Sequence, residues 1–248
     1  MNIESVSRRR VKRSHNSRNL ESKPPNKMAI QSVWQKIQTY FNVLNHCMIS
    51  IVAVYMTFFC YNVGNRLITW HVWLCSIGYQ LLMTQSILVF YSENAWSKQH
   101  TRKTHKTLHW ILQGLGSSAA IAGMIVEFIN RWQDSKNHFI STHSIIGLTA
   151  FILTILGMLN GVSALWAAEL RTYVKPVYLK FAHNLNGIAA FVLGMVALYF
   201  GYDKGFMEKN SREDIRMWLQ ALAIITIILS LIGALRSTLK FTRAVFFN

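Results

Sequence analysis

Residues 143–168 read HSIIGLTAFILTILGMLNGVSALWAA, a run that contains no Lys, Arg, Asp or Glu. As a helix, a run of this length extends about 39 Å, which exceeds the roughly 30 Å hydrocarbon core of a bilayer. Segments of this kind satisfy their backbone hydrogen bonds in lipid by forming helices. Comparable apolar blocks cover residues 43–63, 67–91, 109–130, 181–201 and 217–235. The sequence therefore predicts an all-α fold, a bundle of six transmembrane helices.

The distribution of basic residues predicts the orientation of this bundle. The chain has 248 residues, 52% of them hydrophobic, and a formal net charge of +16. Six spans place both termini on one side, and 19 of the 26 Lys and Arg residues fall on that side. Since basic loops face the cytoplasm, both termini are expected to be cytoplasmic. So basic a chain could also bind nucleic acid, but it carries no recognised nucleic-acid-binding motif. Membrane lipid is therefore an expected partner, and nucleic acid is not.

Composition along the chain predicts three parts. Residues 1–42 are expected to form a disordered, basic cytoplasmic tail and the segment before the first helix. Residues 43–235 are expected to form the transmembrane domain, and residues 236–248 a short cytoplasmic tail. The first apolar block begins too far into the chain for a cleaved signal peptide and is expected to act as an uncleaved anchor. The loops are too short to contain a further soluble domain.

Four of the nine histidines stand near the starts of four successive apolar blocks, at His71, His109, His143 and His183. A chain that crosses the membrane repeatedly alternates in direction, so every second histidine lies near the same face. His71 therefore pairs with His143, and His109 with His183. Ionisable side chains inside a membrane span are costly and usually functional. Two pairs of imidazoles within a four-helix core, formed by the second to fifth spans, suit two six-coordinate haems.

Three details favour haem over other uses of histidine. The blocks offer no carboxylate or cysteine cluster with the ligand spacing of a zinc site. Gly147 and Gly187 follow a histidine by four residues, and Gly78 and Gly116 follow one by seven, which leaves room for a flat ring on the same helix face. Each histidine also lies near the expected N-terminus of its helix, where the helix dipole disfavours imidazolium and so favours the neutral ligand.

Other functions for the four histidines remain open at this point. A proton-coupled membrane carrier could use them as a relay without haem, although the apolar blocks contain no proline to break a helix. A non-catalytic membrane protein is a further alternative. An NADPH-driven reductase is disfavoured, because it would repeat a histidine 13–14 residues along one helix, where this chain has Gln85 and Gly123.

Several short motifs together resemble one family. They are TWH at residues 69–71, LLMTQ at 81–85, HWILQ at 109–113, THS at 142–144 followed by Gly147, and His183 followed by Gly187. In these motifs, over about residues 43–235, the chain resembles the cytochrome b561 family, and most of all its stand-alone six-helix transmembrane reductases. It departs from many related sequences at Val72, where those have proline.

The resemblance implies two haem b groups, one held by His71 and His143 on the non-cytoplasmic side and one by His109 and His183 on the cytoplasmic side. It implies that cytosolic ascorbate donates one electron across the membrane, and that monodehydroascorbate or ferric iron accepts it. The expected location is an endomembrane, such as the endoplasmic reticulum, a vesicle or the lysosome, rather than the plasma membrane. A second copy of the chain, in a homodimer, is a further expected partner.

The resemblance also implies basic substrate residues near the cytoplasmic haem. The candidates are Arg102, Lys103, Lys106, Lys175 and Lys180. Positive charge at this face would attract an anion such as ascorbate, but the orientation of the bundle explains these residues equally well. At the opposite face, no basic residue stands out in the sequence, and the candidate is His138, five residues before His143.

Overall fold

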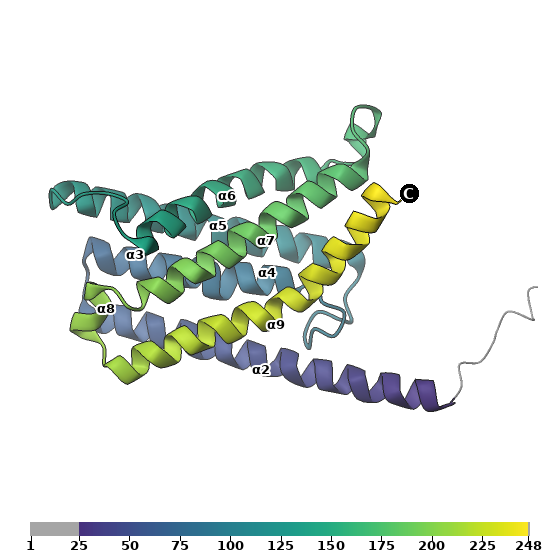
Figure 1. The fold of residues 1–248 in the computed structure, drawn as a ribbon, viewed down its shortest axis with the longest axis horizontal. Helices are drawn as coiled ribbons and strands as arrows, with labels where there is room; N and C mark the ends of the chain where they lie inside the picture. The colour runs from purple at the N-terminus through teal and green to yellow at the C-terminus, as the bar shows by residue number, and fades with distance from the viewer. Residues whose placement is uncertain (1–24, 248) are drawn as a thin grey trace, which may run out of the picture. The chain divides into compact units, whose positions relative to one another are not determined.

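The computed structural model describes residues 25–247, and in this part of the chain all regular structure is helical, as the sequence predicts. Figure 1 shows the elements in chain order. They are α2 (Pro25–Val63), α3 (Leu67–Ser76), the π-helix η1 (Ile77–Met83), α4 (Thr84–Leu88), α5 (Arg102–Gln133), α6 (Thr142–Leu165), the 3₁₀-helix η2 (Glu169–Thr172), α7 (Pro176–Gly201), α8 (Gly205–Asn210) and α9 (Glu213–Phe246).

The chain divides into two compact units, residues 1–38 and residues 39–248. The described part of the first unit is the beginning of α2. The second unit contains all the other helices, and the packing described below lies within it. Residues 25–42 and 236–246, expected to belong to the tails, are helical as parts of α2 and α9. Residues 1–24 of the expected N-terminal tail lie outside the described residues.

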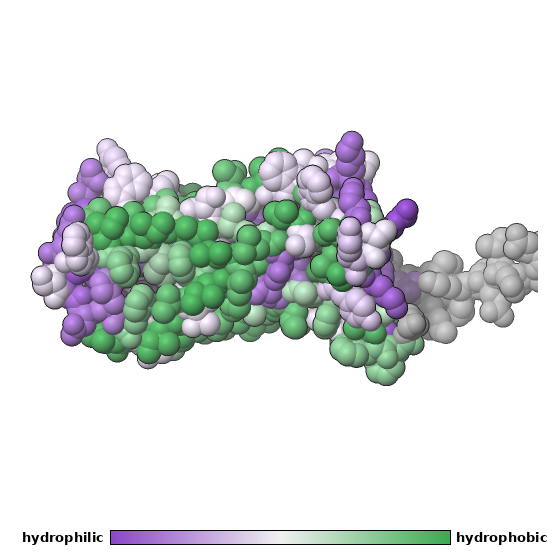
Figure 2. Space-filling view, turned by 90° about the horizontal axis from the view of Figure 1, so that it is seen from above, coloured by the Kyte–Doolittle hydropathy of each residue, from purple (hydrophilic) through white to green (hydrophobic). Residues whose placement is uncertain are grey.

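Five of the described helices are long and apolar enough to cross a membrane, namely α2, α5, α6, α7 and α9. On the face that Figure 2 shows, hydrophobic side chains cover much of the middle and hydrophilic ones gather mainly toward the two ends. The block at 67–91, expected as the second span, is built differently. It forms α3, η1 and α4, which follow one another without a break from residue 67 to residue 88, and none of the three is long enough alone.

The α3–η1 segment crosses α5 in backbone contact. A Cβ atom added to Gly78 would lie 2.9 Å from the Gly116 carbonyl oxygen, and one added to Gly123 would lie 2.8 Å from Cys75 Sγ. Small residues allow this approach, and close packing is what holds helices together in lipid. The interpretation of Gly78 and Gly116 as room for a flat ring is therefore wrong, because these two glycines face each other across a helix crossing.

Helices α2 and α9 pack outside this core through both apolar and polar contacts. Ile49 and Met56 of α2 are fully buried. Asn45 Nδ2 on α2 donates to Ser230 Oγ on α9 at 2.9 Å, and Gln80 Nε2 in η1 donates to Thr226 Oγ1 on α9 at 3.3 Å. Because lipid removes most of the hydrophobic drive for helices to associate, such hydrogen bonds and tight packing stabilise the arrangement.

Candidate functional site

The structure brings the four predicted histidines together in two pairs. The imidazole centroids of His71 on α3 and His143 on α6 are 6.1 Å apart, and the ring planes are inclined by 80°. Those of His109 on α5 and His183 on α7 are also 6.1 Å apart, at 85°. These are the pairs that the alternating direction of the spans predicts.

Backbone carbonyls orient three of the four rings. The Nδ1 atoms of His71, His143 and His109 lie 2.9, 2.8 and 3.0 Å from the carbonyl oxygens of Gly123, Ala197 and Ser86, respectively. A carbonyl oxygen only accepts, so each Nδ1 must carry the proton and donate it. The Nε2 atom of each neutral ring then keeps its lone pair, which is the tautomer of a metal-binding histidine.

The fourth ring differs from the others. His183 Nδ1 is buried and has no hydrogen-bond partner of normal geometry within residues 25–247, although the Gly157 carbonyl on α6 faces it. An unpaired buried nitrogen costs free energy, so this ring is less firmly oriented than its partner. His109 is held more strongly, since Ser86 Oγ also lies 2.8 Å from its Nδ1.

Helices α6 and α7 run side by side in opposite directions (Figure 1) and carry the same spacing of histidine and glycine. The step along the chain from His143 to Gly161 equals the step from His183 to Gly201. A Cβ atom on Gly161 would lie 3.2 Å from His183 Cε1, and one on Gly201 would lie 3.1 Å from His143 Cε1. On each of the two helices, a glycine therefore lies against the imidazole ring of the histidine on the other helix.

The distances between the rings fit two ligands of one iron. A metal–imidazole bond is about 2.0 Å and the ring nitrogen lies about 1.1 Å from the ring centre, so imidazoles on opposite sides of one iron have centroids roughly 6.2 Å apart. Both measured separations, 6.1 Å, agree with this value. Gly147 and Gly187 also leave space. A Cβ atom added to Gly147 would meet only Met124 Cε, at 3.6 Å, and one added to Gly187 would meet no atom within 4 Å. The residues present fit a haem at each pair.

The positions of the histidines within their helices correct one sequence argument. His71 and His143 are the fifth and second residues of α3 and α6, close to the N-termini. His109 and His183 are each the eighth residue, because α5 and α7 begin earlier than expected. The effect of the helix dipole falls off within the first turn. Of the four histidines, only His143 lies within the first turn of its helix, so the dipole favours a neutral imidazole mainly there.

The five predicted substrate residues lie at the same end of the bundle as the His109–His183 pair. Arg102, Lys103 and Lys106 are exposed on the first turns of α5, which carries His109. Lys175 and Lys180 are exposed at the start of α7, which carries His183. None of the five forms an ion pair among the described residues. Because these side chains are exposed, they can contact a soluble anion. They would be equally exposed if their only role were to orient the bundle in the membrane.

A cavity of about 970 Å³ contains the His71–His143 pair at the other end. Its inner wall includes Tyr79, Ala150 and Gly194, and its outer part is formed by residues at the ends of α3, α5, α6, α7 and α8. His138, the sequence candidate, lines this outer part and stacks on Phe128 with a centroid separation of 4.3 Å. The cavity is large enough for a flat cofactor together with a small molecule near its opening.

The outer part of this cavity is positively charged, which the sequence analysis did not recognise. Two acidic side chains, Glu127 and Asp134, line the cavity together with five basic ones, Arg66, Arg131, Lys136, Lys204 and Lys209. The basic residues come from three regions far apart in the sequence, namely the connection before α3, the end of α5 with the connection after it, and the segment between α7 and α9 that contains α8. Each region alone looks like an ordinary solvated segment, and only the fold brings their charges to one opening.

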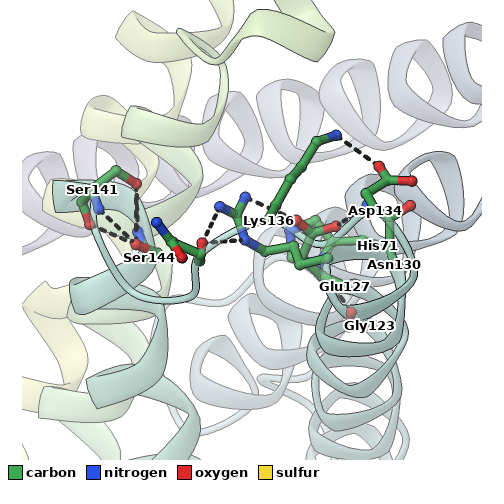
Figure 3. Close-up of polar contacts among 10 residues, drawn as sticks. His71, Gly123, Glu127, Asn130, Asp134, Lys136, Ser141 and Ser144 are labelled. Atoms are coloured by element: carbon green, nitrogen blue, oxygen red, sulfur yellow. Dashed lines mark hydrogen bonds and ion pairs between the residues drawn. The ribbon is translucent and has the colours of Figure 1, made fainter.

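Hydrogen bonds order the connection between α5 and α6 over this cavity (Figure 3). Arg131 donates through both Nε and Nη2 to the Asn137 carbonyl oxygen and forms an ion pair with Glu127 at 3.6 Å. Ser141 and Ser144 then form a capping box at the start of α6. This cap fixes the first turn of α6, and with it His143.

Replacing Gly123 with alanine is expected to weaken any binding of haem at the His71–His143 pair about 10- to 100-fold, the usual effect of losing the partner that orients a ligand. The new methyl group would lie 2.8 Å from Cys75 Sγ and 3.1 Å from Leu74 Cβ. Separation of α3 from α5 would then break the bond between His71 and the Gly123 carbonyl. Haem retained per chain after purification measures the effect.

The double variant G123A/C75A is the matched control for this prediction. It removes the sulfur atom that the new methyl group meets, so it should retain more haem than G123A alone. Equal retention by the two variants would contradict the steric explanation.

The chain is similar to known proteins over the region that contains the four histidines. Residues 70–209, which include all four histidines, match the family model of eukaryotic cytochrome b561. A stretch of 138 residues is 30% identical to the human protein named transmembrane reductase CYB561D2 and covers 56% of this chain and 62% of that protein. The chain thus spans less than two thirds of the length of this relative.

Two further relatives carry similar names. The mouse protein named probable transmembrane reductase CYB561D1 is 25% identical over 138 residues, which cover 56% of this chain and 60% of that protein. The Arabidopsis thaliana protein named probable transmembrane ascorbate ferrireductase 4 is 29% identical over 170 residues, or 68% of this chain and 67% of that protein.

The family match extends over more than half of the chain and confirms the resemblance seen in the short motifs. Together with the five long apolar helices, it makes this a multi-pass integral membrane protein whose family binds haem b. The chain belongs to the eukaryotic cytochrome b561 family.

Proposed function

We propose that the protein carries single electrons across a membrane between two haem b groups. The observation that carries this proposal is the presence of two histidine pairs, each with centroids 6.1 Å apart, near opposite ends of one helical core. His71 and His143 would hold the non-cytoplasmic haem, and His109 and His183 the cytoplasmic one. Haem b at these sites supplies an iron that changes between the ferrous and ferric states by one electron.

The side chains and backbone around each pair would keep the imidazoles ready to bind. The carbonyls of Gly123, Ala197 and Ser86 hold protons on Nδ1 and so keep Nε2 available. Gly161 and Gly201 give His183 and His143 room against the neighbouring helix. The surrounding apolar helices exclude water from the region between the pairs and thereby limit the side reactions of a reduced site.

The protein would cross the membrane six times, with both termini in the cytoplasm. The segments α3, η1 and α4 would together form the second span. Residues 43–235 would be the transmembrane domain between the tail at 1–42 and the short tail at 236–248. An endomembrane is the proposed location, and a homodimer the proposed assembly. The support for this orientation is the excess of Lys and Arg on the side that would carry the termini.

At the cytoplasmic face, ascorbate is the proposed electron donor. It is a monoanion near neutral pH, and the basic residues at the starts of α5 and α7 would raise its local concentration. Arg102, Lys103 and Lys106 lie on the helix that carries His109, and Lys175 and Lys180 on the helix that carries His183. An electron delivered here has the shortest route to the cytoplasmic pair.

At the opposite face, the proposed acceptor is monodehydroascorbate or ferric iron. The five basic side chains around the cavity outnumber the two acidic ones, with which Arg131 and Lys136 form ion pairs, and the remaining positive charge favours an anion such as the monodehydroascorbate radical anion. No three His, Cys, Asp or Glu side chains gather as metal ligands among the described residues. Iron would therefore be taken up as a negatively charged chelate rather than as a bare cation.

Reconstitution into vesicles tests the proposed function. The purified protein should contain two haems per chain, and external ascorbate should reduce both haems and then an acceptor trapped inside the vesicles. A preparation with no haem, or with haem that ascorbate does not reduce, would contradict the proposal. A proton carrier that uses the histidines as a relay would instead show transport driven by a pH gradient without a haem spectrum.

Charge reversal at the cavity opening is expected to weaken use of an anionic acceptor. The double variant K204E/K209E should raise the KM for ferric citrate roughly tenfold at low salt, because each exposed charge contributes up to about 1 kcal/mol. The difference should shrink at high salt, where charges are screened. Steady-state acceptor reduction at two salt concentrations measures both effects.

Lys240 on α9 provides the control for this prediction, since it lies outside the cavity lining. The variant K240E should leave the KM for ferric citrate unchanged. A KM in K204E/K209E equal to that of the unmodified protein would show that these lysines do not select the acceptor.

A further inference from the structure

Tyr79 occupies the interior of the bundle, where three of its elements meet. It belongs to η1, and only 6% of its surface is exposed. Its hydroxyl group lies 2.9 Å from Thr154 Oγ1 on α6, within hydrogen-bond distance. Its ring lies directly against the backbone of Gly194 on α7, since an added Cβ atom there would overlap Tyr79 Cε1. The ring is therefore held at one end by a hydrogen bond and along one edge by a glycine.

Sequence spacing places this layer between the two histidine pairs. Along α3, η1 and α4, Tyr79 is eight residues after His71 and seven before Ser86, whose carbonyl accepts from His109. The helix between His71 and Ser86 is roughly 22 Å long at the usual rise per residue. Tyr79 therefore stands close to the middle of this distance.

The other two elements agree with this position. On α6, Thr154 lies between His143 and Gly161, the glycine that faces His183. On α7, Gly194 lies at the same spacing between His183 and Gly201, the glycine that faces His143. Tyr79, Thr154 and Gly194 thus lie at one level of the core, between the two histidine pairs.

Tyr79 belongs to the π-helix η1, which joins α3 to α4 without a break. Thr84 Oγ1 donates to the Tyr79 carbonyl oxygen, five residues earlier, at 2.8 Å. Such π-helical turns occur frequently at functional sites. Tyr79 also belongs to the wall of the cavity that contains His71 and His143. Its ring therefore extends inward from that site.

We propose that the Tyr79 ring is the bridge for electron transfer between the two haem sites. This inference rests on the proposed function. With haem bound at both pairs, one electron would pass from a ferrous iron at one pair to a ferric iron at the other, and Tyr79 itself would be neither oxidised nor deprotonated. Electronic coupling decays less steeply through bonded, closely packed atoms than through empty space. A ring that fills the middle of the core therefore shortens the empty part of the path.

Three variants separate this role from simple packing. Y79F keeps the ring and loses the hydroxyl group, Y79L loses the ring, and Y79M replaces the ring with a flexible chain of similar length. Tyr55 on α2 provides the control Y55L, because it is a partly buried tyrosine that packs against the core and whose hydroxyl group also has a partner, Ser211, outside the four-helix core. Each protein is purified with its haem and reconstituted for rapid kinetics.

Three quantities are measured on each variant: haem per chain, the midpoint potentials of the two haems, and the rate at which an electron placed on one haem equilibrates with the other. Y79L and Y79M should keep two haems with unchanged potentials and transfer the electron at least roughly tenfold more slowly. Y79F and Y55L should keep the original rate. A merely structural role of Tyr79 would change haem content or potentials together with the rate.

The outcomes are distinct. An unchanged rate in Y79L or Y79M overturns the proposal, and so does a rate in Y79F as slow as in Y79L, which would assign the effect to the hydroxyl group. If Y79L does not assemble, Y79M decides in its place. Fewer than two haems in the unmodified protein would instead overturn the proposed function.

Discussion

The variant H109A is expected to contain one haem per chain instead of two, and H183A is expected to lose the same haem. In the proposed function each imidazole would hold the iron from one side, and the rings of this pair lie 6.1 Å apart, a separation that one iron would bridge. Electron transfer from ascorbate to an acceptor across the membrane should stop in both variants. Haem content and the reduced-minus-oxidised spectrum measure the loss.

H71A and H143A provide the complementary result, since both should lose the other haem and keep the one lost in H109A. The exposed loop residue His100 is the control, and H100A should retain both haems. If H109A and H183A lost spectrally different haems, the pairing would be wrong. Two haems in any of the four variants would show that the substituted histidine is not a ligand.

The variant G194A is expected to destabilise the core. The added methyl group would overlap Cδ1 and Cε1 of the Tyr79 ring and lie 2.6 Å from its Cζ. That ring is buried and its hydroxyl group is held by Thr154, so it has little freedom to move away. Overpacking of this kind costs about 1–3 kcal/mol and sometimes more. The midpoint of thermal unfolding in detergent, with the yield of haem-containing protein, measures the effect.

A second substitution tests the cause of this destabilisation. The double variant G194A/Y79L removes the ring that the methyl group meets and should unfold at a higher temperature than G194A. G205A, at the start of α8, is the control, because an added Cβ there meets only Glu208 Oε2 at 3.8 Å. An unfolding temperature of G194A equal to that of the unmodified protein would show that the ring moves aside at little cost.

The glycines show how far the sequence could be interpreted. Gly147 and Gly187 leave open space as their spacing from the histidines suggests, but Gly78 and Gly116, at a different spacing, form a helix crossing. A glycine lowers the steric limit for any approaching group, whether a cofactor or another helix. The fold decides whether a cofactor or another helix approaches a given glycine, so spacing alone could not separate the two cases.

The substrate residues show a related limit. Arg102 and the other candidates lie close in the sequence to His109 or His183, where the resemblance implies basic substrate residues. Arg66, Lys136 and Lys204 lie in separate connections and were not recognised, although the structure gathers them around one cavity. A charge shared among distant loops has no local signature, whereas a charge run within one loop does.

The sequence by itself determined the helical class, the apolar blocks and the alternation that pairs His71 with His143 and His109 with His183, because block length and histidine spacing are local properties of a chain that crosses lipid. The tertiary structure decided the rest. The carbonyls of Gly123, Ala197 and Ser86 orient the rings. Every residue has a backbone carbonyl, so the sequence cannot indicate which ones accept these hydrogen bonds. Likewise, the inward position of Tyr79 depends on a π-helical turn and on Gly194, far away in the chain, which come together only when the helices pack.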